Sequence, residues 1–375
     1  MKIVIAPDSF KGSLSAREAG LAIERGVRRA IPDCETIIVP MADGGEGTVS
    51  CLVEATDGRL VQTTVKDPLG REVQAEFGIL GGGETCVIEM AASSGLYLIG
   101  AEERNPLLTT TYGFGQLIKA GLDEGCRQFI LGLGGSATND GGAGMLQALG
   151  ADLLDKDGHN VGLGGAELAH VTDIRTELMD PRLIESTFIV ACDVGNPFCG
   201  PNGASYVFGP QKGATPEMAA QLDESLGRFA DVIERTRGYA IHDIPGTGAA
   251  GGLAGGILAF LNAGLDSGID IVMEVTGLER RLVDADLLIT GEGRIDSQTA
   301  EGKTPCGVAR LAKKHLVPAI GLAGSVGGGI EALYEEGLAA VLSIVNGPMT
   351  LEEAMSRTAE LLEQASEQAV RVYNC

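Results

Sequence analysis

The residues best suited to chemistry in this sequence are acidic, and each stands beside glycine near the end of an apolar, strand-like stretch. These carboxylates are Asp8, Asp43, Glu46, Asp140, Asp193, Glu292 and Asp296. Cations in or next to the same kind of glycine turn are Lys11, Lys212, Arg294 and Lys303. Phosphoryl transfer needs such a set, because amides and cations hold phosphates, carboxylates hold Mg²⁺ and a base takes the hydroxyl proton. Singly, each acid is more often a cap or turn residue, but seven at strand ends together favour a site.

The longest glycine loop lies within the stretch FILGLGGSATNDGGAGMLQALG, residues 129–150. An apolar strand at 129–131 leads into the loop, and a helix follows it through Met145, Leu146 and Leu149. This order brings bare backbone amides up to an anion. Side chains in the loop that can bind phosphate or a metal-bound water are Ser136, Thr138, Asn139 and Asp140. The glycines could instead only allow a tight turn with positive φ, but similar loops recur along the chain, which favours ligand binding.

Composition limits the classes of function. The 375 residues suggest two to three domains, and 44% apolar with 21% charged residues is ordinary for a globular protein. Glycine is about twice as frequent as usual, at 56 residues, yet forms no low-complexity tract. A net charge of -23 opposes nucleic acid and anionic membranes, so we exclude both as partners. The same field means that cations or Mg²⁺ must attract any anionic substrate.

The eight cysteines are scattered without a CxxC pair or Cys/His cluster, so we expect reduced thiols and neither a zinc site nor disulfides. The chain opens on MKIVIAPDSF, which predicts a strand and no signal peptide. No apolar run reaches the ~18 residues of a membrane span. We therefore expect a soluble, cytoplasmic protein. The sequence leaves open whether it is a homo-oligomer.

The pattern along the chain predicts an α/β protein with an inserted middle. Strands at 2–6 and 36–39 alternate with helices, the first of which has a capping box at Ser15 and Glu18. Period-two segments at 60–66, 73–80 and 85–90 predict a meander. Strands return at 285–290, 319–323 and 340–344, and could join the N-terminal strands in one sheet. We predict a discontinuous α/β domain of residues 1–60 plus 276–375, and an inserted α/β domain of residues 61–275.

Three further local predictions concern the middle and the end of the chain. A hairpin is expected from 151–154 and 159–161 about Asp157-Gly158, and Thr215 with Pro216 should begin a long helix. The glycine-rich run at 246–256 opens a helix, and its small residues could bind a ligand or allow close helix packing. The segment 350–353 should cap a single final helix reaching about residue 372.

Several common motifs are missing. Gly302-Lys303-Thr304 is no P-loop, because Ser297 occupies the position of the required first glycine. Residues 132–137 satisfy a loose GxGxxA dinucleotide fingerprint, but the run Asn139-Asp140-Gly141-Gly142 intervenes before the helix, which fits a wider phosphate loop better. There is no GxSxG or HExxH motif, and the four histidines lie outside the glycine loops, so histidine-based nucleophilic catalysis is not expected.

Six segments, in order along the whole chain, resemble the bacterial glycerate kinase family. They are APDSFKGSLSA (6–16), MADGGEGT (41–48), GLGGSATNDGGAGM (132–145), ACDVGNP (191–197), FGPQKGA (208–214) and TGEGRIDSQTAEGKTP (290–305). The resemblance implies ATP-dependent phosphorylation of D-glycerate, usually to 2-phosphoglycerate, with ATP and Mg²⁺ required. It also implies two α/β domains, one Rossmann- or flavodoxin-like and one mixed domain resembling a restriction-endonuclease core, with the active site in the cleft between them.

On this reading we assign roles to the candidate residues. The nucleotide-binding set is Gly134, Gly135, Ser136, Thr138, Asn139 and Lys303. The catalytic set is Asp193, Asp43, Lys11 and Lys212, in which either aspartate could be the base and the lysines neutralise the transferred phosphoryl group. The substrate set is Asp8, Ser9, Arg294 and Glu292, with Arg294 expected to pair with the glycerate carboxylate. The metal set is Asp43, Asp140 and Asp296.

Two alternatives stay open. The fingerprint at 132–137 could serve an NAD(P)-dependent hydroxy-acid dehydrogenase. A non-catalytic protein that binds an acidic metabolite could use the same scaffold, although an anion sensor would be expected to carry fewer acids at its glycine turns. Binding of NADH against binding of ATP separates the first alternative from a kinase.

Overall fold

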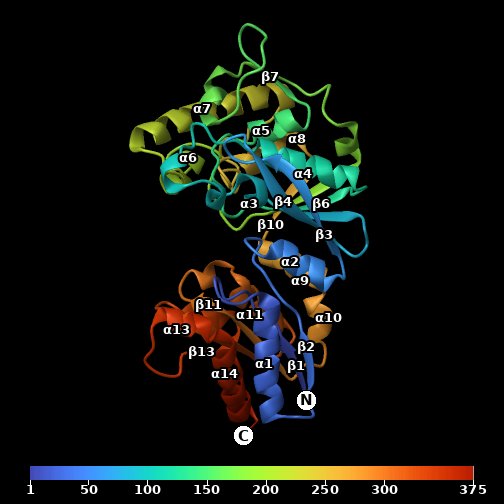
Figure 1. The fold of residues 1–375 in the computed structure, drawn as a ribbon, viewed down its shortest axis with the longest axis vertical. Helices are drawn as coiled ribbons and strands as arrows, with labels where there is room; N and C mark the ends of the chain where they lie inside the picture. Colours follow the sequence, from blue (N-terminus) through green and yellow to red (C-terminus); the bar gives the residue numbers. More distant parts are fainter. Residues whose placement is uncertain (375) are drawn as a thin grey trace. The chain divides into compact units, whose positions relative to one another are not determined.

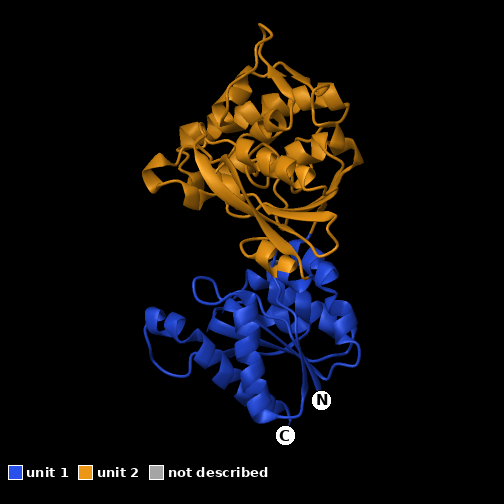
Figure 2. Ribbon diagram, turned by 45° about the vertical axis from the view of Figure 1, so that its right-hand side comes forward, with its two compact units in different colours: residues 1–43, 54–56, 267–375 blue, residues 44–53, 57–266 orange. Residues whose placement is uncertain are grey.

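A computed structural model describes residues 1–374, apart from the side chain of Glu301, and it divides into two compact units (Figures 1 and 2). Unit 1 comprises residues 1–43, 54–56 and 267–375, and unit 2 comprises residues 44–53 and 57–266. The predicted domain boundaries and the predicted cleft stay predictions. No helix in residues 1–374 combines the length and the apolar character needed to cross a membrane. None of the seven cysteines in residues 1–374 forms a disulfide, and Cys375 lies outside the described residues.

Unit 1 is built on a five-stranded parallel sheet that combines strands from both ends of the chain. This confirms the predicted joining of the N-terminal and C-terminal strands. The strands read as continuous apolar runs because both faces of a parallel sheet are covered. In spatial order they are β13 (Leu338–Ser343), β12 (Ala319–Val326), β11 (Leu287–Ile295), β1 (Lys2–Ile5) and β2 (Glu35–Ile38).

Helices cover both faces of this sheet. Ile3, Ile5 and Leu322 are buried with residues of α1 and α14, which run side by side (Figure 1). Alternate residues such as Val4 and Leu288 are equally buried and point to the other face, and α11 packs against β11 and β12. The helices are α1 (Ala16–Ala30), α9 (Gly268–Thr276), α10 (Leu278–Leu282), α11 (Thr304–Lys314), α12 (Glu331–Glu336), α13 (Leu351–Ser356) and α14 (Thr358–Tyr373).

Unit 2 contains a six-stranded mixed sheet. Its first three strands pair antiparallel in sequence order, which confirms the predicted meander, and the other pairs are parallel. In spatial order the strands are β10 (Ala263–Asp266), β9 (Thr187–Ala191), β6 (Gln128–Gly132), β5 (Thr85–Glu89), β4 (Glu72–Ile79) and β3 (Arg59–Lys66). A separate two-stranded sheet consists of β7 (Asp152–Leu154) and β8 (Asp173–Arg175).

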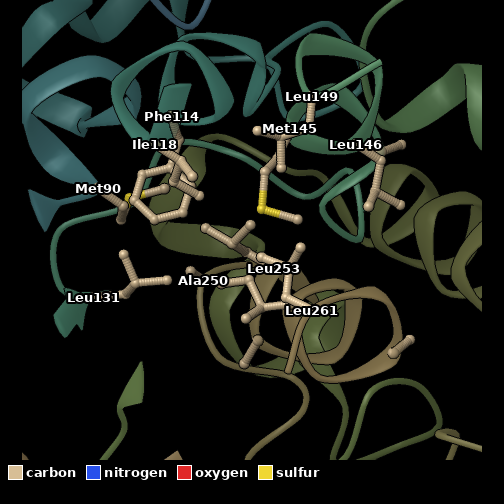
Figure 3. Packing of buried hydrophobic residues seen from close by; sticks show 14 of the residues in the cluster. Met90, Phe114, Ile118, Leu131, Met145, Leu146, Leu149, Ala250, Leu253 and Leu261 are labelled. Atoms are coloured by element: carbon tan, nitrogen blue, oxygen red, sulfur yellow. The ribbon is translucent and has the colours of Figure 1, made fainter. Parts of the chain in front are cut away.

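The core of unit 2 lies between this sheet and its helices. Figure 3 shows Phe114, Leu131, Met145 and Leu253 directed toward one another from four different elements, and each is fully buried. The helices among residues 44–260 are α2 (Thr48–Ala55), α3 (Ala91–Ser94), α4 (Tyr112–Asp123), α5 (Ala143–Ala148), α6 (Ala204–Phe208), α7 (Pro216–Arg237) and α8 (Leu253–Phe260). Thr215 caps α7 and Pro216 is its first residue, as the sequence predicts.

Three local predictions differ from the structure. Strand β7 pairs with β8, and the expected partner at 159–161 forms no strand. That segment contacts β7 only through an isolated bridge between Leu154 and Asn160 and nearby hydrogen bonds such as that from the amide of Val161 to the carbonyl of Leu153. Strand β11 continues through Gly291–Ile295, where a turn was expected, because its ladder with β12 extends that far. The single final helix is two helices, α13 and α14, with a break at Arg357.

Candidate active site

The sheet of unit 1 reverses its strand order between the neighbouring strands β1 and β11. From β1 the chain crosses to β2 on one side, whereas β11 leads to β12 and β13 on the other. Pairing continues past the end of β1, because the amide of Asp8 donates to the carbonyl of Gly291 at 2.8 Å. Ligands of open α/β sheets bind beyond the carboxyl ends of the strands at such a point. The side chains here form the first part of the candidate site.

Asp8 lies at this switch point with both carboxylate oxygens engaged. Thr304 Oγ1, at the start of α11, donates to Asp8 Oδ2 at 2.5 Å, and the amide of Ser9 donates to Oδ1 at 2.5 Å. Burial raises the pKa of Asp8 to about 6 in spite of these bonds, and the charge of Asp43 adds to the increase. The ionised form of Asp8 is therefore poorly compensated by the chain itself.

Glu292 lies on β11, one residue beyond Gly291. Thr299 Oγ1 donates to Glu292 Oε1 at 2.7 Å. Burial raises the pKa of Glu292 to about 7; the charges of Asp8 and Asp43 raise it further, whereas Lys303 lowers it. We call Asp8, Asp43 and Glu292 the acidic cluster, since their charges act on one another within unit 1.

The acidic cluster fits a magnesium ion by its chemistry. Mg²⁺ prefers hard oxygen ligands and is usually held by one or two carboxylates together with substrate phosphates. Burial is the main reason that the pKa values of Asp8 and Glu292 are raised, and repulsion from neighbouring carboxylates adds to it. A divalent cation would offset that repulsion. The oxygen donors and the negative charge of the cluster are chemically suited to a divalent cation, although its three carboxylates do not lie as close together as those of a preformed metal-binding group.

Other predicted residues surround the cluster in unit 1. Arg294 is exposed and donates through Nε to Asp296 at 2.7 Å. This bond, with one from the amide of Gln298, lowers the pKa of Asp296. Lys303 directly precedes α11. Lys11 is exposed in the turn after β1, and a Cβ at Gly293 would lie 3.6 Å from its amide nitrogen. Residues 8, 9, 11 and 292–304 thus belong to the same edge of the sheet.

The long glycine loop leaves β6 in unit 2 and ends at α5. Gly134 and Gly135 are exposed, whereas Ser136, Thr138 and Asn139 are buried. The loop is held by the segment after α3, because Leu96 donates its amide to the carbonyl of Gly135 at 2.9 Å. A Cβ at Gly134 would lie 3.2 Å from Gly45 Cα, so the glycines also permit close approach of a second glycine turn. The solvent-facing part of the loop is therefore bare backbone.

Asp140 braces this loop from inside. It is fully buried, and it accepts hydrogen bonds from the amide and hydroxyl of Thr111 at 2.8 and 3.0 Å and from the amide of Gly142 at 3.2 Å. Burial raises the pKa of Asp140, while the bonds from Thr111 and Gly142 oppose the increase. These contacts favour a bracing role over the predicted metal-binding role.

Lys212 also points into the protein. Its Nζ donates to the carbonyl of Thr138 at 2.6 Å, and only 1% of the residue is exposed. Burial lowers the pKa of Lys212 to about 7, against a smaller opposing effect of the Asp140 charge. Asn139 donates through Nδ2 to Ser205 Oγ at 2.9 Å. Buried atoms here that lack a partner are Thr138 Oγ1 and Asn139 Oδ1.

Asp193, the predicted base, is exposed two residues after β9 in unit 2. In residues 1–374, one group of three His, Cys, Asp or Glu side chains lies close enough together to hold a metal ion. It consists of Asp231, Glu234 and His242 on the surface of unit 2. None of the predicted metal ligands belongs to that group.

Some residues of the site were missed from the sequence. Thr299 and Thr304 donate to Glu292 and Asp8. Each is the first residue of a helix, a position that gives no sign of contact with a carboxylate from another element. Thr111 contacts Asp140 from 29 residues away, a separation that no local pattern reveals. Glu89 ends β5 and accepts the amide of Val49 at 2.9 Å; its place at a strand end was the signal that could have found it.

A parallel sheet with acidic residues at its switch point, together with a glycine loop beyond a second parallel strand, defines an α/β enzyme for small polar ligands. The chain matches the glycerate kinase family over residues 3–374. A protein named glycerate kinase from Bacillus subtilis strain 168 is 53% identical over 366 residues, covering 98% of this chain and 96% of that protein. One named glycerate 2-kinase from Escherichia coli K12 is 50% identical over 354 residues, covering 94% and 93%.

A crystal structure assigned to glycerate kinase 2 of Salmonella typhimurium LT2 superimposes with a TM-score of 0.92 at 49% identity, covering 100% of this chain and 98% of that one. This chain therefore belongs to the glycerate kinase family, and it is a kinase. The resemblance and the α/β fold class predicted from the sequence are confirmed. The comparisons favour neither the dehydrogenase nor the non-catalytic alternative.

Proposed function

We propose that this protein transfers the terminal phosphoryl group of ATP to the 2-hydroxyl of D-glycerate in the presence of Mg²⁺, giving 2-phosphoglycerate. The observation that carries the proposal is the acidic cluster at the switch point of unit 1. The names of the relatives from Bacillus subtilis and Escherichia coli support glycerate as the acceptor, and the second of them supports position 2. The free cysteines support the cytoplasm as its location.

For the metal we propose Asp43 as the principal ligand, with Asp8 and Glu292 beside it. When bound, Mg²⁺ would neutralise charge on the nucleotide phosphates. Asp296 is engaged with Arg294 and Asp140 braces the glycine loop, so both are weaker candidates than Asp43. Thr304 and Thr299 orient Asp8 and Glu292, which keeps the oxygens of the cluster in fixed positions.

For ATP we propose that the exposed amides of Gly134 and Gly135, with Ser136, receive phosphate oxygens. Thr138 and Asn139 would act from the buried side of the same loop, where Lys212 holds the carbonyl of Thr138. Lys303 and Lys11 carry positive charge beside the acidic cluster and would offset charge on the transferred group.

For D-glycerate we propose that Arg294 pairs with the carboxylate. Asp296 is bonded through Nε of Arg294, and a guanidinium has five N–H donors, so donors remain for a second carboxylate. Ser9 follows Asp8 at the same sheet edge and would contact a substrate hydroxyl.

Asp193 is the proposed base for the substrate hydroxyl. Asp193→Asn should lower kcat by at least ~10²-fold, because an amide cannot accept the proton. Steady-state assays with saturating ATP and D-glycerate measure this. A near-normal kcat would remove Asp193 from the role and leave Asp43 as the candidate.

Phosphorus NMR tests the proposed reaction and its position together. The full chain is incubated with ATP, Mg²⁺ and D-glycerate. A phosphate on the C2 oxygen couples to one proton and gives a doublet, whereas a phosphate on C3 couples to two and gives a triplet. We expect ADP and the doublet. A triplet would contradict the position, and the absence of any phosphate ester would contradict the reaction.

A further inference from the structure

Arg104 differs from the other arginines of the described chain. Its Nε is shielded from solvent and has no hydrogen-bond acceptor, the one such arginine nitrogen in residues 1–374. By contrast, Arg71 and Arg182 are each held by two carboxylates. The chain carries a net charge of -23, so carboxylate partners are plentiful. A buried donor without a partner requires an explanation.

Arg104 lies on a segment, residues 95–109, that contacts the long glycine loop of unit 2 at two points. It directly follows the 3₁₀ turn η2 (Ala101–Glu103). The segment is fastened to the loop before Arg104, where Gly95 pairs with Ser136. It is fastened again after Arg104, where Thr109 Oγ1 donates to the carbonyl of Ala137 at 2.8 Å. Along the chain, Arg104 therefore lies between two contacts with the loop that we propose for phosphates.

The turn that carries Lys212 packs closely against the backbone of Arg104. Gly213 has a φ of +93°, and a Cβ there would meet the carbonyl oxygen of Arg104 and lie 3.0 Å from its Cβ. The two cations are thus on adjoining backbone, and Lys212 reaches Thr138 in the same loop. The buried, unpartnered Thr138 Oγ1 and Asn139 Oδ1 belong to this loop as well. Thr138 and Asn139 are each 0% exposed.

Of these two cations, Arg104 is the one suited to an anion. Lys212 is buried and bound to a carbonyl, and burial lowers its pKa to about 7, so it carries only part of a charge at neutral pH. An arginine remains charged, and its planar fork matches the two oxygens of a carboxylate or phosphate.

We propose that Arg104 binds an anionic group of a substrate, a phosphate of the nucleotide or the carboxylate of the acid, beside the glycine loop of unit 2. The proposal rests on the proposed function and adds a direct binding residue to it. Arg104 supplies positive charge in a chain whose overall field repels both substrates. Thr138 and Asn139, whose buried side-chain oxygens lack partners, belong to the loop beside which we place this anion.

Arg104→Gln and Arg104→Lys, with Arg235→Gln as the matched control, test this. Arg235 is exposed in the same unit and donates only to the carbonyl of Thr172, at 3.5 Å. We expect Arg104→Gln to raise KM and the dissociation constant at least about 10-fold for one substrate, and Arg104→Lys to restore part of the loss. An effect on ATP identifies a phosphate, and an effect on D-glycerate identifies the carboxylate. Arg235→Gln should change neither.

The proposal would be overturned if KM and the dissociation constant in Arg104→Gln equalled the wild-type values for both substrates, even if the melting temperature of the variant were lower. If that variant does not fold, chemical modification of Arg104 in the wild-type protein tests the proposal instead. Phenylglyoxal should modify Arg104 more slowly in the presence of one saturating substrate, measured by peptide mass spectrometry. An unchanged rate with both substrates would overturn the proposal. Calorimetric binding without turnover would contradict the proposed function alone.

Discussion

Asp140 and Lys212 are charged residues that the fold turns inward. Both were predicted to touch ligands, and both make their observed contacts with the backbone of the glycine loop or its neighbours. Burying an ionisable group is costly unless it is hydrogen-bonded. These contacts offset that cost and fix the loop, so we propose that the two residues would act on a nucleotide through the loop.

Asp140→Asn should destabilise unit 2. The NH₂ group of an asparagine would replace one of the two carboxylate oxygens. It would face either the donors of Thr111, which bond to Oδ2, or the amide of Gly142, which bonds to Oδ1, and so leave a buried donor unpaired. We expect the free energy of unfolding to fall by roughly 3 kcal/mol, measured by urea denaturation.

The matched control is Asp173→Asn, an exposed carboxylate of the same unit paired with Arg175 at 3.3 Å. It should change stability by less than about 0.5 kcal/mol. Equal effects of the two substitutions would contradict the bracing role of Asp140.

Lys212 should impose a pH dependence on stability. Its pKa is 10.5 in the reference state and about 7 in the folded protein, so the unfolded chain binds more protons between these values. Its contribution to stability is therefore full above pH 10.5 and is lost as pH falls toward 7.

Relative to Lys212→Met, the wild type should thus gain free energy of unfolding as pH rises from 7 to 9.5, at up to about 1.4 kcal/mol per pH unit. Urea titrations of both proteins at each pH measure the difference. A difference that does not change with pH would show that Lys212 keeps its ordinary pKa.

At the level of elements, the glycine loop depends on a second glycine segment packed beneath it. Gly251 has a φ of +71°, and a Cβ there would collide with the carbonyl oxygen of Thr138. Small residues at 246–256 thus allow close packing, one of the two explanations left open by the sequence. The amide of Gly141 donates to the carbonyl of Gly251 at 3.0 Å, which joins the two segments.

Gly251→Ala should therefore cost more than the backbone strain alone. Gly158→Ala is the control, because its φ is +81° and a Cβ there meets nothing within 4 Å. We expect a loss of about 1–2 kcal/mol for Gly158→Ala and a clearly larger one for Gly251→Ala, with reduced affinity for ATP. Equal losses of stability would show that the contact with Thr138 yields without cost.

The sequence predicted the elements whose signals are local. The capping box of α1 and the Thr215 cap of α7 are as expected, because cap chemistry involves neighbouring residues. The extension of β11 through Gly291–Ile295 was missed, since glycine is rare in strands and only pairing with β12 reveals it. The break at Arg357 was missed because the apolar pattern continues across it.

For the candidate site, the position of Asp8 and Glu292 at one edge of the sheet could be predicted from the sequence, whereas their contacts could not. Asp8 and Glu292 were chosen because they follow apolar strands, and the parallel sheet brings them to one edge. Their partners Thr304 and Thr299 come from outside those strands and carry no distinct signal. The inward direction of Asp140 depends on Thr111, a contact that tertiary packing alone creates.

At the scale of the whole molecule, the charge of -23 opposes the binding of the two anionic substrates that we propose. In our proposal, local positive charge offsets this repulsion in each unit. A divalent cation supplies it at the acidic cluster of unit 1, and Arg104 supplies it beside the glycine loop of unit 2. If the acidic cluster holds the metal, the reaction must depend on magnesium through Asp43.

The most direct measurement is ADP formation from ATP and D-glycerate during a magnesium titration, for wild type and Asp43→Asn. We predict no turnover in EDTA, saturable activation of the wild type, and at least a 10-fold higher half-saturating magnesium concentration or a lost rate in the variant. Turnover at full rate in EDTA, or identical titrations of the two proteins, would contradict the account.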